Sequence, residues 1–236
     1  MDKGGREHPA PGKAKKVAQY FASVAAPVCA MIGLLVAAAC GAAAQEKSSA
    51  PSAPLYVGSE ACAGCHAAET VTWKKSHHAA AMTVATHVTV HGDFNNAIAE
   101  NRGSKGRFFR DGNRFIVETE GRDGKTARFD VSHTFGFEPL QQYLVTFPDG
   151  RLQALPWAWD ARAKEAGGQR WFHLYPNQPM PSSDPLHWTR SMQNWNFMCA
   201  ECHTTGLRKN YDAARDRFNS SFSEIGVGCE SCHGPG

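Results

Sequence analysis

The sequence predicts an α+β fold, in which helices and irregular loops alternate with an inserted β-meander over residues 105–160. Three observations support this prediction. The pattern Cys-x-x-Cys-His occurs three times, in segments that favour a short turn or helix. Residues 105–160 contain short aromatic and β-branched runs separated by Asp-Gly steps, which are typical of hairpins. A long uncharged stretch near the N-terminus sets off the remaining chain as a separate domain.

The three Cys-x-x-Cys-His motifs carry the clearest chemistry in the chain. Two thiols at this spacing can form thioethers with the vinyl groups of one porphyrin, and the adjacent imidazole then lies under the iron as an axial ligand. The motifs therefore predict three covalent haems of c type, packed among the helices and loops. Their residues are Cys62, Cys65 and His66; Cys199, Cys202 and His203; and Cys229, Cys232 and His233.

Two other uses of these cysteines stay open. The second and third motifs supply two Cys-x-x-Cys pairs, as in a zinc ribbon, and a redox-active dithiol uses the same spacing. Neither chemistry needs a histidine after each pair, and a zinc ribbon would leave the Cys62 motif without a partner. Haem attachment is favoured for this reason.

Residues 1–44 are predicted to be a signal peptide or an N-terminal anchor. A polar, basic beginning is followed by an uncharged run with its most apolar part at 28–39, which is shorter than a typical membrane span. Cleavage near 42–44 is favoured. The alternatives are a retained anchor and a lipidated Cys40, either of which would attach the protein to a membrane.

The remaining chain divides into a flexible linker over 45–57 and a multihaem cytochrome c domain over 58–236. Each alternative for the N-terminus places this domain in the periplasm or on the extracytoplasmic face of a bacterial membrane. The chain has 25 basic and 22 acidic residues, and the net charge of +3 arises within the first forty residues. The domain itself is balanced, so nucleic-acid binding is excluded.

Local patterns predict the elements of this domain. Ser59 should be a helix N-cap. Within 60–86, a short turn at the first motif should be followed by a helix that carries Trp73, His77, His78 and Met82. Residues 87–103 should form a loop, 160–198 an irregular segment, and 194–209 a helix around the second motif. Strands are expected at 105–110, 114–120, 125–133, 144–147 and 152–159. The meander aromatics Phe108, Phe109, Phe115, Phe135 and Phe137 should form core, whereas Trp73, Trp157, Trp159, Trp171, Trp188 and Trp195 should stack on haem edges.

Several segments resemble bacterial multihaem cytochromes c. They are 57–66 (VGSEACAGCH), 76–82 (SHHAAAM), 134–144 (TFGFEPLQQYL), 168–176 (GQRWFHLYP), 184–189 (DPLHWT), 194–203 (NWNFMCAECH) and 228–236 (GCESCHGPG). The resemblance is to relatives similar to the tetrahaem electron-transfer cytochrome of ammonia oxidisers, and is closest to members fused to tetratricopeptide repeats. Such members continue beyond the third motif, so the chain is expected to be truncated at its C-terminus.

The resemblance also implies distal iron ligands. His78 and His187 match family positions that ligate iron, and His77 is the alternative to its neighbour His78. His173 is a third candidate, with a buried imidazole bonded to backbone as the alternative reading. Met82, Met192 and Met198 are weaker candidates as thioether ligands and more typical of core packing.

The favoured function is electron transfer between redox partner proteins, such as a membrane quinol oxidoreductase and a periplasmic reductase or oxidase. Three haems within so short a domain must lie close together. The first alternative is an enzyme that reduces small nitrogen or sulfur oxyanions at an iron with an open side. The second is a haem-stapled interaction module of a larger tetratricopeptide-repeat protein. Whether the protein is an enzyme stays open, with electron transfer preferred.

Overall fold

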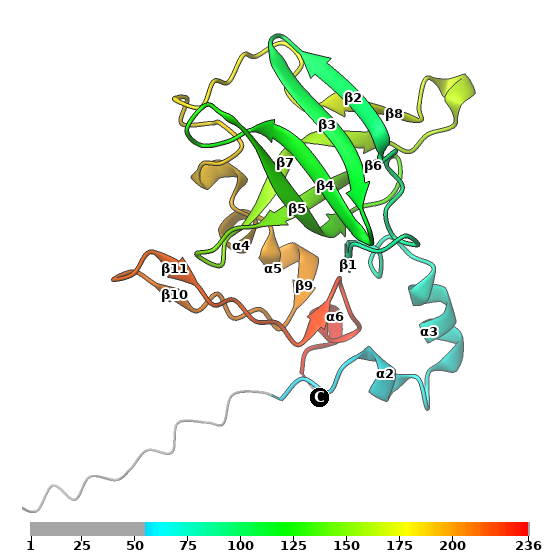
Figure 1. Ribbon diagram of the computed structural model, residues 1–236. Coiled ribbons are helices and arrows are strands. Elements are labelled where there is room, and N and C mark those ends of the chain that lie inside the picture. Colours follow the sequence, from blue (N-terminus) through cyan, green and yellow to red (C-terminus); the bar gives the residue numbers. More distant parts are fainter. Residues whose placement is uncertain (1–54, 236) are drawn as a thin grey trace, which may run out of the picture. The chain divides into compact units, whose positions relative to one another are not determined.

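The computed structural model describes residues 55–235, which belong to one compact unit (Figure 1). The predicted signal segment 1–44 and most of the linker 45–57 lie outside the described residues. No helix within the described part is long and apolar enough to cross a membrane.

An antiparallel sheet forms the body of this unit. Its strands follow one another in the order β2-β3-β4-β5-β6-β7-β8, and β1 pairs with β5 beside this path. The two ends of the order, β2 and β8, contact each other, so the sheet curls into a nearly closed, barrel-like shape. The bounds are β1 Met82–Val84, β2 Asn95–Asn101, β3 Ser104–Asp111, β4 Arg114–Glu120, β5 Thr126–Phe135, β6 Leu140–Thr146, β7 Leu152–Asp160 and β8 Arg170–His173.

The five predicted strands are present as β3 to β7, with ends that differ by a few residues. The Asp-Gly steps turn the chain between them, since Gly112 and Gly124 have φ angles of 60° and 79°. Sequence patterns missed β1, β2 and β8. The segment of β2 (NNAIAEN) falls within the predicted loop 87–103, and its asparagine and alanine residues are poor strand formers.

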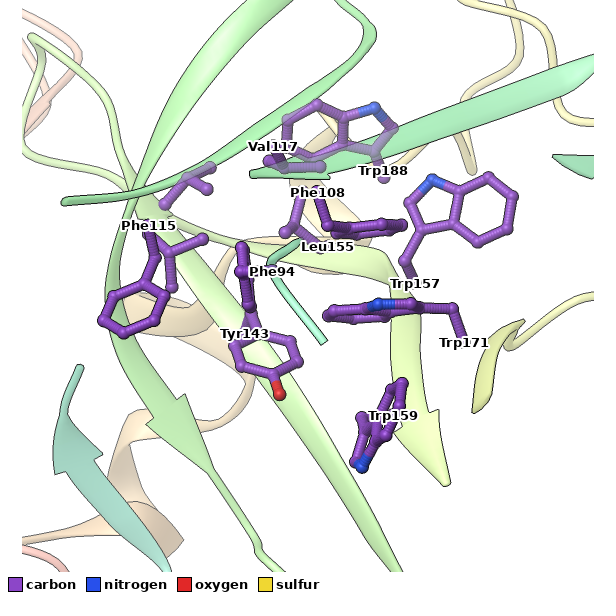
Figure 2. Close-up of a cluster of buried hydrophobic side chains, with 12 residues drawn as sticks. Phe94, Phe108, Phe115, Val117, Tyr143, Leu155, Trp157, Trp159, Trp171 and Trp188 are labelled. Atoms are coloured by element: carbon purple, nitrogen blue, oxygen red, sulfur yellow. The ribbon is translucent and has the colours of Figure 1, made fainter. Parts of the chain in front are cut away.

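Aromatic side chains fill the inside of the curled sheet (Figure 2). Phe108 stacks on Trp171 with ring centres 3.6 Å apart and planes at 5°. The ring of Phe94 meets Phe108, Phe115, Tyr143 and Trp171 edge to face. The core role predicted for Phe108 and Phe115 is confirmed, whereas Phe109, Phe135 and Phe137 are only half-buried.

Five of the six tryptophans, expected to stack on haem edges, lie instead in buried clusters of protein side chains. Trp157, Trp159, Trp171 and Trp188 belong to this aromatic core. Trp195 lies in a second buried cluster with Met82, Leu144, Ala154 and Ala200. The indoles in the first cluster stabilise the sheet, and this leaves Trp73 as the tryptophan that lines a cavity next to the cysteine motifs.

The predicted fold class, a haem-packed helical α+β domain with a β-meander insert, is wrong. The described chain is mostly β, and the sheet is its main body rather than an insert. The longest helix among residues 55–235 has 8 residues. The physical reason is that each Cys-x-x-Cys-His motif needs only one turn of helix, while most of the aromatic residues that build the core lie in strands.

At the first motif the chain forms the short helix α2 (Ser59–Cys62), and the helix predicted after it is only the short α3 (Ala67–Lys74). Gly58 rather than Ser59 occupies the N-cap position of α2. After α3 the chain turns, and the Ser76 hydroxyl donates to the carbonyl of Trp73 over 2.7 Å. His77 and His78 therefore lie in turns, and Met82 lies in β1.

The helix expected over 194–209 is also much shorter. Single turns form α4 (Trp195–Met198) and α5 (Ala200–His203), and the chain then extends as β9 (Thr204–Thr205). Within 160–198, β8 and two 3₁₀ turns, η1 (Lys164–Ala166) and η2 (Ser191–Gln193), interrupt the expected irregular path. Two small hairpin-like pairs follow, β10 (Tyr211–Asp212) with β11 (Arg217–Phe218), and β12 (Glu224–Ile225) with β9. The last helix is α6 (Glu230–His233).

Candidate haem-attachment sites

All three cysteine motifs adopt a similar turn. In each, the backbone N–H of the second cysteine donates to the carbonyl of the first, over 3.2 Å at Cys65, 3.1 Å at Cys202 and 3.3 Å at Cys232. In each, the first cysteine is half-buried and the second is exposed. The turn thus presents one sulfur close to the protein body and one toward solvent, three times over.

The state of the sulfurs agrees with thioether formation. The six motif cysteines form no disulfides with one another. The zinc alternative finds no support, because residues 55–235 contain no group of three or more His, Cys, Asp or Glu side chains arranged to hold a metal ion. The four sulfurs of the second and third motifs are therefore not gathered as in a zinc ribbon.

The first and third motifs face one common cavity. It has a volume of about 650 Å³, within the range of sites that bind cofactors. One wall comes from α2, α3 and the turn that follows, and the other comes from α6, as these elements lie together in Figure 1. Its motif residues are Cys62, His66, Cys229, Cys232 and His233, and its other lining includes Glu69, Trp73, His78 and Glu230.

Hydrogen bonds that two carboxylates accept connect the two walls. Glu230, inside the third motif and only 5% exposed, accepts the backbone N–H groups of Val57 and Gly58 over 3.1 and 2.7 Å. Glu224 Oε2 accepts both the N–H and the hydroxyl of Ser59, over 3.2 and 2.8 Å. Ser59 Oγ in turn accepts the N–H of Cys229 over 2.9 Å.

A second set of contacts connects the third motif to the segment that follows the second motif. Thr205 follows His203 by two residues, and its hydroxyl accepts the N–H of Gly228 over 2.9 Å. The same oxygen lies 2.7 Å from Ser231 Oγ, inside the third motif. We call the group Ser59, Thr205, Glu224, Gly228 and Glu230 the junction, because it links all three motifs.

The junction leaves no room for a side chain at Gly228. A Cβ there would collide with the Glu224 carboxylate and would lie 2.7 Å from Ser59 Oγ. Two further backbone contacts run beside it: Gly226 N donates to the carbonyl of His203 over 3.1 Å, and Val227 N donates to that of His78 over 3.0 Å. The motifs, far apart in the sequence, are thus set close together by ordinary hydrogen bonds.

The imidazole of the second motif is already oriented for an iron. His203 Nδ1 lies 2.7 Å from the carbonyl oxygen of Ala81, which can only accept, so Nδ1 carries the proton. This tautomer leaves Nε2 with a free lone pair, the atom that ligates metals in such arrangements. Phe135 meets the ring edge to face at 5.4 Å and restricts its rotation.

Electrostatics in the shared cavity disfavour free thiolates. Burial, then the neighbouring Cys229 and then the carboxylates of Glu230 and Glu224 raise the pKa of the Cys62 thiol. Burial and the neighbouring Cys202 likewise raise the pKa of Cys199. The acidic side chains of the junction therefore act on the first motif as well as on the third.

The candidate distal ligands divide between two places. His78 lines the cavity of the first and third motifs, whereas its exposed neighbour His77 lies against Phe137 with ring centres 4.6 Å apart. His173 and His187 are buried and line another cavity of about 290 Å³, whose lining contains no motif residue. Burial lowers the pKa of both imidazoles. Tyr175 N–H donates to His173 Nδ1 over 3.1 Å, as in the buried, backbone-bonded alternative.

The methionine candidates are also separated. Met82 is fully buried in β1 next to Leu144 and Trp195, and Met192 and Met198 are about half exposed. The residues that sequence reasoning missed are those of the junction. Ser59 and Glu224 are 165 positions apart, and no local sequence pattern indicates such a pair. A local pattern could have indicated only Glu230 and Gly228, because they lie in and beside the third motif.

Three motifs in the attachment turn, an imidazole with a free Nε2 lone pair and a cavity of cofactor size are features that multihaem proteins of the cytochrome c class share. Comparison with known families agrees: the model of the family described as cytochrome c554 and c-prime matches residues 61–103 and 178–234. These segments contain all three motifs and make up less than half of the chain. The residues between them, which include all of β3 to β8, are not matched.

One solved structure is similar, the crystal structure of the outer cell wall cytochrome OcwA. The TM-score is 0.44 and the sequence identity 23%, over 77% of this chain and 32% of that chain. The present chain thus spans about a third of that protein. A search of curated proteins found no match.

Proposed function

We propose that this protein binds three covalent haems and transfers electrons between redox partner proteins outside the cytoplasmic membrane. The observation that carries the proposal is the junction, where single side chains join the three motifs. When bound, each haem supplies a one-electron iron couple. The chain's residues fix the attachment points, orient His203 and close the cavity walls, so that the three centres stay near one another.

The cavity supports a role for His78 as a distal ligand. It shares the lining with both motif histidines, His66 and His233, and its backbone carbonyl is held by Val227 N. An iron with both axial positions filled by imidazole moves electrons without binding substrate. We assign His78 to the first or the third centre and leave His77 against Phe137.

The test uses the full chain, matured in a bacterium that assembles c-type haem. Reductive titration should consume three electrons per chain, and the oxidised spectrum should be low-spin. His78→Ala should convert about one of the three haems to a high-spin spectrum, because the iron loses an imidazole.

The neighbouring variant His77→Ala is the comparison and should keep the low-spin spectrum. A spectrum unaltered by His78→Ala would remove His78 from the ligand set. Cyanide or nitric oxide binding to one iron of the unaltered protein would instead favour the enzymatic alternative, since it requires an open axial position.

A further inference from the structure

The cavity that contains His173 and His187 opens at one end of the curled sheet, apart from the cysteine motifs. It has a volume of about 290 Å³, and no motif residue lines it. The turn between β2 and β3 contributes residues 101–104 to its lining, and the chain after β8 contributes residues 178–181. The mouths of β-barrels are frequent ligand sites, and ligand pockets begin at roughly 300 Å³, so this cavity suits a small molecule.

Hydrogen bonds within the protein hold the lining of this cavity in place. Arg102 Nε donates to the carbonyl of Pro176 over 3.0 Å, and Ser182 N–H donates to Glu120 Oε1 over 2.8 Å. Trp188 Nε1 donates to the backbone carbonyl of Glu120 over 2.8 Å. The cavity is therefore formed before any ligand binds, as is usual for small-molecule sites.

His187 presents a hydrogen-bond donor to the cavity. Thr189 donates to Nδ1 from its backbone N–H over 3.4 Å, and its hydroxyl oxygen lies 2.9 Å from the same nitrogen. A ring nitrogen that accepts has no proton, so the neutral ring carries its proton on Nε2. Within residues 55–235, the one fully enclosed side-chain nitrogen or oxygen without a partner is Trp195 Nε1. His187 Nε2 forms no hydrogen bond either, so it borders open space, and the cavity is the open space that His187 lines.

Glu120 presents a hydrogen-bond acceptor beside this donor. Its Oε1 lies 3.8 Å from His187 Nε2, which is too far for a hydrogen bond. A carboxylate accepts at about four positions, and Ser182 occupies one of them. A hydroxyl group both donates and accepts, so one hydroxyl of a ligand can bond to His187 and Glu120 together.

The charges of the lining favour a neutral ligand. Arg102 and Glu120 carry opposite charges and both line the cavity. Asn101 and Gln178 add amide groups, which donate and accept as hydroxyl groups do, and Trp188 adds apolar surface. A metal ion is not expected here, because residues 55–235 contain no group of three or more His, Cys, Asp or Glu side chains arranged to hold one.

We propose that this cavity binds a small neutral polyhydroxy compound, about the size of one sugar ring, with a hydroxyl group held between His187 Nε2 and Glu120. His187 then has a role other than the iron ligation that the family resemblance implies. The inference does not depend on the proposed electron transfer, because the cavity and the motifs have separate linings.

Isothermal titration calorimetry of the full, haem-loaded chain tests the choice of ligand. Glucose, inositol and glycerol are the neutral probes, and acetate and inorganic phosphate are the charged comparisons. At least one neutral probe should bind with a Kd below about 1 mM, and both charged probes should bind at least about tenfold more weakly. Failure of all three neutral probes to bind, or tighter binding of either charged probe, would overturn the proposal.

Glu120→Gln tests the acceptor. The variant keeps the side-chain shape and should weaken binding of the neutral probe about tenfold, because a hydrogen bond to an ionised group is replaced by a weaker one. Glu118→Gln is the matched control on the same strand. The carboxylate of Glu118 pairs with Arg128 over 2.9 Å outside the cavity, and its loss should change binding by less than about twofold. Equal effects of the two variants would contradict the assignment of Glu120.

His187→Phe tests the donor and separates it from iron ligation. The variant keeps a planar ring but removes the Nε2 proton, so it should weaken binding about tenfold while the haem spectrum stays low-spin. A new high-spin component would show that His187 ligates an iron and would overturn the proposal. If this variant fails to fold, the comparison of Glu120→Gln with Glu118→Gln still decides. Fewer than three haems in the unaltered protein would overturn the proposed function and leave the binding test unaffected.

Discussion

Two hydroxyl groups hold the cysteine motifs together at the scale of single residues. Ser59 Oγ lies between Cys229 N and the Glu224 carboxylate, and Thr205 Oγ1 lies between Gly228 N and Ser231. Each hydroxyl both donates and accepts, which lets one short side chain join two segments. The geometry requires Gly228, because any larger residue would displace the carboxylate.

A substitution at Gly228 therefore tests the junction. Gly228→Ala should lower the free energy of unfolding by about 1–3 kcal/mol, because the new methyl group overlaps Glu224 and Ser59. Gly64→Ala is the matched control inside the first motif, since nothing lies within 4 Å of a Cβ there, and it should change stability by less than about 0.5 kcal/mol. Denaturant titration of the haem-loaded chain measures both, and equal effects would contradict the junction.

Residue patterns predicted part of this site. The six cysteines and three adjacent histidines follow from a local motif whose chemistry fixes its own spacing, and the structure gives all three the attachment turn. The junction could not be predicted, because its bonds join residues distant in the sequence. The ligand roles of His78 and His187 stay predictions, and the structure places these two residues in separate cavities.

At the scale of strands and helices, the aromatic core stabilises the curled sheet. Strands β3, β7 and β8 bring Phe108, Trp157 and Trp171 into contact. Gly106, opposite Trp157, allows this close packing, since a Cβ there would lie 3.0 Å from the indole. The sheet thus has its own core, apart from any packing against haem.

Removing one aromatic ring should weaken the sheet. Phe108→Ala should cost about 3–5 kcal/mol, because a fully buried ring leaves a cavity that the rigid strands cannot fill. Ile98→Ala, on the exposed side of β2, should cost less than about 0.5 kcal/mol. Thermal or denaturant unfolding measures the difference, and a Phe108→Ala protein as stable as the unaltered chain would argue against this core.

Sequence patterns worked for strands and failed for helices. Alternating aromatic and β-branched residues with Asp-Gly turns identified β3 to β7. The alanine-rich composition within 60–86 suggested a helix that runs from after the first motif to Met82. In the structure α3 stops at Lys74, where the Ser76 hydroxyl donates to the carbonyl of Trp73. Helix propensity is a weak preference, and tertiary contacts such as that between Met82 and Phe135 in paired strands override it.

The whole molecule combines a β body with three one-turn attachment sites. The predicted fold was a helical, haem-packed domain because the interpretation relied mainly on the cysteine motifs. The pairing of strands into a closed sheet depends on contacts between distant residues, which local sequence patterns indicate only weakly. The first and third motifs come from the two ends of the described chain and meet at one cavity. The second is tied to them through β9 and β12.

The central claim is that porphyrin is bonded to the chain at all three motifs. Intact mass of the full chain, matured with a c-type haem assembly system and compared with its pyridine haemochrome spectrum, tests this claim most directly. The account predicts the mass of the mature polypeptide plus three haems. A mass equal to that of the bare polypeptide, or a colourless protein that contains zinc, would contradict it.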